Sequence, residues 1–338
     1  MSRSLFQPLT IGSVSLQHRV VLAPLTRLKA DANHVPLLPL TNIIAAKAGG
    51  FPNMPGIWSP EQIKAWTEVV NGVHAKGSFI FLQLAALGRG AIPDVLRAED
   101  PTFSIVSASD IPSTKDGERP RPLTVAEIQE YVDLYVQAAK NAMEAGFDGV
   151  EIHGSTANGC LTDQFLQDVS NNRTDAYGGS VENRARFPLE VVKAVAEAVG
   201  ENKTAIRFSP WSPFAGMGMA DPVPTFTYIV SEIKRLFPDF AYIHLIEPRI
   251  AAGEDVDKYG ATVHLSASGD FSRQTAIKLT DERKNALVAF GRHFIANPDL
   301  PLRLEKNIPL HPYDRPTFYL PGLDAPTGYT DQPFASQA

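Results

Sequence analysis

Three side chains capable of acid–base or hydrogen-bonding chemistry follow one apolar stretch, residues 149–152. They are His153, Asn158 and Cys160. An imidazole exchanges protons near neutral pH, and a thiol, with a reference pKa of about 8.5, can also donate one. A buried cysteine can equally fill apolar space, and a histidine can serve as a hydrogen-bonded core residue. The cluster therefore predicts a proton-transfer site, with those structural roles as the alternatives.

Further polar or special residues stand at the ends of other apolar stretches. They are Pro24, Thr26, Gln83, Gly291 and Arg292. Thr26 and Gln83 could be plain polar groups at strand ends, and Gly291 could serve only a tight turn. Arg207 differs from them, because it lies inside an apolar stretch. Burying its cation would cost so much free energy that a specific partner is implied.

The elements that must position these residues alternate along the whole chain. Short apolar stretches, typical of buried parallel strands, are separated by helical patterns. The stretches are residues 19–23, 79–82, 149–152, 205–208, 242–245 and 287–290. The number of repeated units favours a (β/α)8 TIM barrel over a doubly wound sheet. In such a barrel the active site lies at the C-terminal ends of the strands, where the candidate residues stand.

Two of the predicted helices carry explicit start signals. Residues 59–62 (Ser-Pro-Glu-Gln) form a capping box with proline at the first helical position. Thr124 and Glu127 form a second capping box, before a helix expected to run to about Ala145. Gly146 then suits the C-terminal stop.

Two units of the predicted barrel are less regular than the others. The second strand should fall between residues 39 and 58, where only 42–45 is strand-like. The seventh is expected near residues 262–265, with no clear helix before it. From residue 301 the chain is rich in proline and aromatic residues, which predicts a tail, 301–338, that wraps the barrel surface. Without a linker or internal repeat, residues 1–338 are expected to form a single domain.

Composition narrows the class of protein. The 338 residues include 31 basic and 37 acidic side chains, a net charge of −6 that argues against nucleic acid as a partner. The sequence contains no stretch of about 18 apolar residues, so no membrane span is predicted. The single cysteine and the absence of an apolar leader at the N-terminus lead us to expect a cytoplasmic protein.

Four segments, in order along the chain, resemble the flavin-dependent old yellow enzyme family. They are 23–27 (Ala-Pro-Leu-Thr-Arg), 83–89 (Gln-Leu followed by Gly-Arg), 173–188, and 289–298. The resemblance extends over nearly the whole chain and looks closest to fungal members that serve specialised metabolism. It implies FMN as the cofactor and NADPH or NADH as the reductant. The 173–188 segment itself suits a braced loop with Ser180 as a helix cap.

The resemblance also implies roles for individual residues. Gln83 and Arg207 match the residues that contact the pyrimidine edge of the flavin and stabilise its reduced anion, and Thr26 matches a hydroxyl near flavin O4. Pro24, Gly269 and Gly291 fall among the cofactor-binding positions. Arg292 would hold the phosphate, which a guanidinium binds in bidentate fashion.

Several positions depart from the family pattern, which places His-x-x-Asn-x-Tyr after the fourth strand. There the histidine and asparagine hold the carbonyl oxygen of an enone, and the tyrosine protonates the α-carbon. In this chain four residues separate His153 from Asn158, and Cys160 stands at the tyrosine position. Ala85 and Ala86 replace an aromatic residue, and Asp270 adds negative charge beside the expected phosphate turn. Both irregular barrel units look shortened.

Three functions are compatible with these features. The first is an FMN-dependent NAD(P)H reductase of an activated C=C bond, acting on a bulky enone-type natural product, with His153 polarising the carbonyl. The second is a non-redox isomerase or cyclase that uses His153 or Cys160 on the inherited scaffold. The third is a catalytically inactive relative. A monomer and a homodimer are both open.

Overall fold

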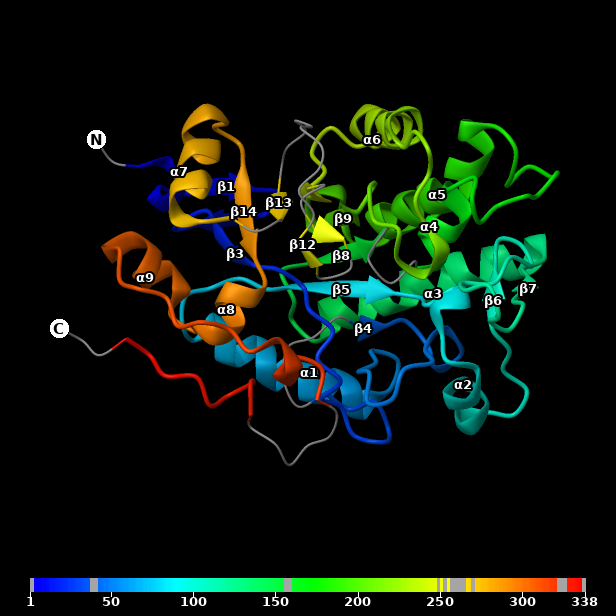
Figure 1. Ribbon diagram of the computed structural model, residues 1–338, viewed down its shortest axis with the longest axis horizontal. Helices are drawn as coiled ribbons and strands as arrows, with labels where there is room; N and C mark the ends of the chain where they lie inside the picture. The colour runs from blue at the N-terminus through cyan, green and yellow to red at the C-terminus, as the bar shows by residue number, and fades with distance from the viewer. Residues whose placement is uncertain are drawn as a thin grey trace.

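The computed structural model describes residues 3–36, 42–154, 160–247, 250–251, 254–255, 266–268, 271–320 and 327–335. An 8-stranded parallel sheet is its central feature, with the order β3-β14-β13-β10-β9-β8-β5-β4 (Figure 1). From β4 onward, each strand of this sheet pairs with the strand of the sheet that follows it in the chain, and the last strand, β14, pairs with the first, β3. This is the strand order of a (β/α)8 barrel, so the predicted fold class is confirmed. Among the described residues no ladder joins β3 to β4.

The barrel strands lie where the apolar stretches predict them. They are β3 (Val20–Leu22), β4 (Asn42–Ile43), β5 (Phe81–Ala85), β8 (Gly149–His153), β9 (Thr204–Phe208), β10 (Tyr242–Ile246), β13 (Ser266–Ser268) and β14 (Leu287–Phe290). The short second strand falls inside the predicted 42–45. The seventh begins directly after the predicted 262–265, which lie outside the described residues.

Helices surround the strands, and both predicted capping boxes are present. The helices are α1 (Pro60–His74), α2 (Pro93–Glu99), α3 (Val125–Glu144), α4 (Leu161–Leu166), α5 (Val181–Val199), α6 (Val223–Leu236), α7 (Arg273–Glu282), α8 (Arg292–Ala296) and α9 (Leu300–Lys306). Ser59 Oγ accepts from the Gln62 amide at 3.3 Å, and Thr124 Oγ1 accepts from the Glu127 amide at 3.2 Å. Gly146, with φ +91°, follows the end of α3 as predicted. No helix of the described chain combines the length and apolarity needed to cross a bilayer.

In both irregular units the described residues between the strands include no helix. Between β3 and β4, the described residues 23–36 contain no helix. Between β10 and β13 the described residues contain only a small hairpin, β11 (Ile250–Ala251) with β12 (Glu254–Asp255). Both following strands are nevertheless present and paired. The strands that carry the strand-end residues are therefore retained in both units.

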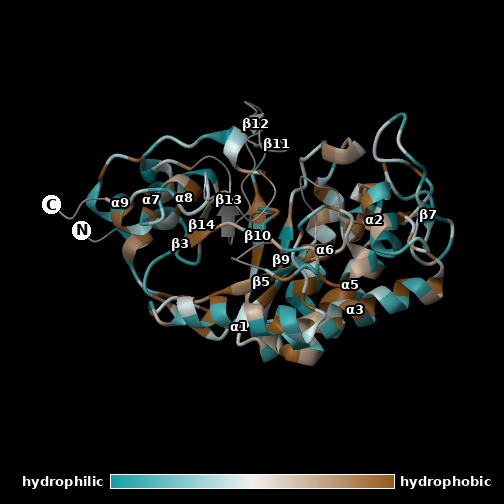
Figure 2. Cartoon of the chain, turned by 90° about the horizontal axis from the view of Figure 1, so that it is seen from below, coloured by the Kyte–Doolittle hydropathy of each residue, from teal (hydrophilic) through white to brown (hydrophobic). Residues whose placement is uncertain are grey.

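The main core lies between the strands and the helices α1, α3, α5 and α6. In Figure 2 the brown, hydrophobic surfaces of α3 and α5 face inward and their teal surfaces face outward. Trp66 of α1 is fully buried, packs edge-on against Phe147 at 5.6 Å, and donates its indole N–H to the Gly56 carbonyl at 3.0 Å. Large buried aromatic side chains with a satisfied polar atom stabilise such a layer strongly. This packing fixes the positions of β5, β8 and β9.

Short elements close the remaining surfaces. A hairpin, β1 (Leu9–Ile11) with β2 (Val14–Leu16), precedes the first barrel strand, and β6 (Val106–Ser107) pairs with β7 (Arg121–Pro122) beside α2. The tail contacts the first barrel unit, because buried Arg27 donates to the carbonyls of Phe318 at 2.9 Å and Gly328 at 2.5 Å. The extent of the domain, residues 1–338, stays a prediction.

The 173–188 segment is braced by one arginine, as the sequence predicts. Arg173 donates to the backbone carbonyls of Ala108 at 3.1 Å and Leu123 at 2.7 Å, and it pairs with Asp175. Ser180 caps α5 by accepting from the Asn183 amide at 3.3 Å. The arginine thus ties the loop before α5 to two separate backbone segments.

Replacing Arg173 by alanine should lower the free energy of unfolding by about 2–3 kcal/mol, because hydrogen bonds to a largely buried charged group are lost together. Urea unfolding of the purified protein measures this. Arg119→Ala, which removes a solvent-exposed pair with Asp110, is the matched control and should cost about 0.5 kcal/mol or less. Equal losses in the two variants would contradict the bracing role.

Candidate active site

The candidate residues converge at the C-terminal ends of β8 and β9. His153 is the last residue of β8, and its register partner on β9 is Arg207. Arg207 in turn is paired with His244 of β10. Paired residues of neighbouring parallel strands project to the same side of the sheet, so these three side chains form one row. His153 and His244 are almost completely buried.

Cys160 lies next to His153 although six residues separate them in the chain. Its sulfur is 3.0 Å from His153 Nδ1. The contact depends on α4, which begins directly after Cys160. Thr162 donates its hydroxyl to the His153 carbonyl at 2.8 Å, and the Leu161 amide donates to Ala86 O at 2.9 Å. Cys160 also packs in an apolar cluster with Ile43, so its structural and chemical interpretations both apply.

The surroundings of His153 keep its imidazole neutral. Burial lowers its pKa to about 3, and the positive charge of Arg207 acts in the same direction. A neutral imidazole carries one N–H, and the thiol at Nδ1 can donate its proton there. The N–H is then on Nε2, which is buried and has no hydrogen-bond partner among the described residues. Such an atom is a donor available to a ligand.

A chain of buried polar side chains crosses the inside of the barrel, and of its members the sequence predictions named only Gln83 as a site residue. Gln83 Nε2 donates to Glu151 Oε1 at 2.6 Å, and Glu151 Oε2 lies 3.0 Å from His244 Nδ1. His244 Nε2 lies 3.0 Å from the hydroxyl of Ser268. A polar residue at every second position of an apolar strand, as in Glu151 and His153, is the pattern that could have revealed it. Gln83 and Arg207 therefore share one interior with a buried carboxylate.

The other predicted cofactor residues have mixed placements. Pro24 and Thr26 follow β3 and are partly exposed. Gly291 precedes α8, and a Cβ at its position would make only ordinary contact with Leu25, at 3.4 Å. Arg292 binds the Tyr313 hydroxyl at 3.0 Å and stacks on its ring. Asn158 and Gly269 lie outside the described residues.

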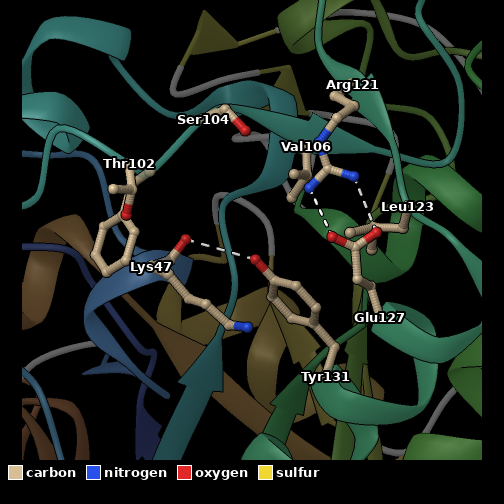
Figure 3. Close-up of a pocket in the computed structure, with 9 residues that line it drawn as sticks. Lys47, Thr102, Ser104, Val106, Arg121, Leu123, Glu127 and Tyr131 are labelled. Carbon is tan, nitrogen blue, oxygen red and sulfur yellow. Dashed lines mark hydrogen bonds and ion pairs between the residues drawn. The ribbon is translucent and has the colours of Figure 1, made fainter.

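A separate pocket lies above the N-terminus of α3 (Figure 3). Its volume is about 180 Å³, and it contains none of the strand-end residues. Its polar groups bind one another: Arg121 pairs with both carboxylate oxygens of Glu127, and Tyr131 donates to the Lys47 carbonyl at 3.4 Å. The chemistry of the strand ends, rather than this hollow, therefore defines the candidate active site.

The strand-end residues fit a flavin. An isoalloxazine ring offers nitrogen and oxygen acceptors along its pyrimidine edge, and its reduced form is an anion. Arg207 Nε is a buried donor without a hydrogen-bond partner in the described structure, and it belongs to a cation on the barrel's inner row. Gln83 lies two strands away with its amide orientation fixed by Glu151. Donors and positive charge are thus present where an acceptor-rich, anion-forming ring needs them.

Comparison with known proteins agrees with this geometry. Residues 40–311 match the family described as NADH:flavin oxidoreductase / NADH oxidase. A chanoclavine-I aldehyde reductase of Penicillium roqueforti is 46% identical, covering 98% of this chain and 97% of that protein. A probable inactive dehydrogenase of Claviceps fusiformis is 44% identical, covering 99% and 96%. The first alignment spans 364 positions, 26 more than the 338 residues of this chain, which agrees with the shortened units.

Solved structures extend the likeness to the fold. The old yellow enzyme from Pichia sp. AKU4542 superposes with a TM-score of 0.89 at 33% identity, covering 99% of this chain and 95% of that one. Morphinone reductase in complex with tetrahydroNAD superposes with a TM-score of 0.86 at 36% identity, covering 99% and 98%. The fold and the strand-end site thus define an FMN-dependent oxidoreductase that takes electrons from a nicotinamide.

The chain belongs to the NADH:flavin oxidoreductase / NADH oxidase family, as a relative of fungal reductases of specialised metabolism. The predicted cofactors, FMN with NADPH or NADH as the reductant, agree with this assignment.

The low pKa of His153 predicts a pH dependence of folding. Because its folded pKa of about 3 lies below the ordinary value of about 6.5, the unfolded chain takes up the proton first as the pH falls. The resulting stability is present above pH ~6.5 and is lost as the pH falls toward ~3. When the pH falls from ~6.5 to ~4.5, the free energy of unfolding of His153→Gln should decrease by about 2 kcal/mol less than that of the wild type.

Denaturant unfolding at several pH values measures this difference. The matched control is His311→Gln, because His311 is exposed at the surface and should leave the pH dependence unchanged. If the free energy of unfolding fell equally with pH in the wild type and in His153→Gln, His153 would not be a buried neutral base.

Proposed function

We propose that the protein reduces the activated C=C bond of an α,β-unsaturated carbonyl compound, a bulky specialised metabolite. The observation that carries the proposal is the buried Nε2 of His153 at the barrel mouth, which has no hydrogen-bond partner among the described residues. The name of the P. roqueforti relative, an aldehyde reductase, supports a substrate with a carbonyl group. When bound, FMN supplies a hydride that originates from NAD(P)H.

His153 binds the carbonyl oxygen of the substrate through Nε2–H. As hydride adds to the β-carbon, negative charge develops on that oxygen, and a preorganised donor in a water-poor site stabilises it. The neutral state of His153 suits this role, since a neutral imidazole can donate a hydrogen bond without giving up its proton. Addition of one proton at the α-carbon then completes the saturated product.

Cys160 acts first by orienting His153. With its thiol at Nδ1, the imidazole proton is held on Nε2, which is the nitrogen that faces the substrate. Cys160 is completely buried, so water is the simplest source of the α-proton, and the thiol is the alternative source. Either source would take the place of the family's tyrosine as the proton donor.

A second candidate is an enzyme without net redox chemistry, or an inactive relative. The altered loop after β8 favours it, because Cys160 stands where the family's proton donor is expected. The C. fusiformis relative, described as a probable inactive dehydrogenase, supports the inactive alternative. Substrate conversion without NAD(P)H would support an isomerase.

His153→Asn tests the reductase directly. With FMN bound, NADPH should bleach the flavin absorbance equally in the wild type and the variant, because that half-reaction does not involve the substrate carbonyl. Reoxidation by a simple enone or enal should slow by about 10²–10³-fold in the variant, the typical cost of losing one oxyanion donor. Stopped-flow absorbance separates the two half-reactions.

Two further variants sharpen this test. Cys160→Ser keeps an O–H donor at Nδ1 and should retain most activity, whereas Cys160→Ala should slow reoxidation about tenfold because the tautomer is no longer fixed. His311→Asn, which changes an exposed side chain, is the control. Reoxidation that is unchanged in His153→Asn would overturn the proposed carbonyl contact.

A further inference from the structure

Four buried side chains inside the barrel form a continuous hydrogen-bonded chain that the proposed reaction does not use. Gln83, Glu151, His244 and Ser268 come from β5, β8, β10 and β13, and they are between 2% and 6% exposed. The three contacts measure 2.6, 3.0 and 3.0 Å. Burying four polar groups from four strands is costly unless each is satisfied, so the arrangement constrains every member.

Glu151 is the centre of this chain and carries the negative charge. Burial acts to raise the pKa of its carboxyl, but the contacts with His244, the charge of Arg207 and the Gln83 amide outweigh burial and lower it. An ionised carboxylate only accepts hydrogen bonds. His244, whose pKa burial lowers, therefore donates from Nδ1 to Glu151 and accepts at Nε2 from Ser268.

The carboxylate fixes the orientation of the Gln83 amide. If that amide were turned over, its carbonyl oxygen would face Glu151 Oε1 at 2.6 Å, and two acceptors would repel each other. The N–H side of Gln83 is therefore held toward Glu151. Since an amide has one donor and one acceptor end, the arrangement that Gln83 offers to a ligand is determined by Glu151.

Glu151 also lies beside the charge of Arg207, because its register partner on β9 is Ala205, and residues two apart on a strand point to the same side. Burial lowers the pKa of Arg207, and the Glu151 carboxylate is the foremost charge that opposes this. The register partners of Arg207, His153 and His244, both have lowered pKa values and contribute no positive charge at neutral pH. Tyr242, also on β10, has its pKa raised by burial and stays neutral. Glu151 is thus the charge that offsets Arg207 among the groups on β8, β9 and β10.

We propose that Glu151, held by His244 and Ser268, is a positioning residue that sets both the affinity and the reduction potential of the flavin. It acts on affinity by orienting Gln83 and on potential by offsetting Arg207. The inference rests on the proposed contacts of Gln83 and Arg207 with the flavin. Removing the carboxylate charge leaves Arg207 less offset, which favours the anionic reduced flavin and raises the potential.

Glu151→Gln is the primary test, with the protein loaded with FMN. The reduction potential, measured by equilibration with a dye of known potential, should rise so that the reduced-to-oxidised ratio at a fixed potential increases about tenfold, which for two electrons corresponds to about 30 mV. FMN affinity, measured by quenching of flavin fluorescence, should fall about tenfold, because the new amide can present an N–H to Gln83. Glu190→Gln, which removes a part-buried carboxylate on α5 bonded to Tyr177, is the control and should change neither quantity.

A double-mutant cycle separates the two actions. In a Gln83→Leu background, Glu151→Gln should no longer weaken FMN binding, but it should still raise the potential, since that effect passes through Arg207. Ser268→Ala provides a milder change: the buried Nε2 of His244 loses its hydrogen-bond donor, His244 is held less firmly against Glu151, and FMN affinity should fall a few-fold. If Glu151→Gln does not fold, this variant carries the test.

The outcomes distinguish the inference from the function beneath it. Suppose that the wild type binds FMN and that Glu151→Gln, or Ser268→Ala in its place, has the same FMN affinity and reduction potential as the wild type. That result would overturn the positioning role alone. A folded wild type that takes up no FMN would overturn the flavin contacts of Gln83 and Arg207 and, with them, this inference.

Discussion

The balance of charge inside the barrel constrains the rest of the site. Arg207 and Glu151 both lie in an interior from which water is largely removed, where either charge alone would be driven to neutralise. The opposite charge of each residue lowers the free-energy cost of burying the other. The negative charge requires donors around it, which Gln83 and His244 provide. The positive charge opposes a second cation nearby, and this helps to keep His153 neutral. The charges of Glu151 and Arg207 and the neutral state of His153 are thus determined by their contacts within the protein.

The segment after β8 departs from the family pattern in length, but its end has a defined position. It is two residues longer between His153 and Asn158 than the family pattern, yet its end is fixed where α4 begins. Thr162 binds the backbone at His153, and Gln164 binds the Leu87 carbonyl at 2.9 Å. The position of Cys160 therefore depends on contacts after the loop rather than on the loop length. A thiol is thus held at His153 Nδ1 by contacts that lie outside the loop.

Much of the fold could be predicted from the sequence, because its determinants are local. Apolar stretches gave the positions of the strands, and the capping boxes at Ser59 and Thr124 gave the starts of two helices. The candidate site was predicted in part: His153, Cys160, Gln83 and Arg207 lie on or directly beside the barrel strands. The contact of Cys160 with His153 could not be predicted, since it depends on how α4 packs. Glu151 and His244 were missed because each looks like an isolated polar residue until the register brings them together.

The pairing of β3 has a consequence for the order of events during synthesis. Among the described residues its ladder partner is β14, with Val20 beside Val288, and Arg19 binds the carbonyl of Lys284 at 2.6 Å. The first barrel strand to leave the ribosome is therefore fixed by the last one. Until translation passes residue 290, β3 lacks the one ladder partner that the described residues give it, and an unpaired strand edge can associate with other chains. In this protein the first barrel strand is therefore synthesised first and gains its described ladder partner last.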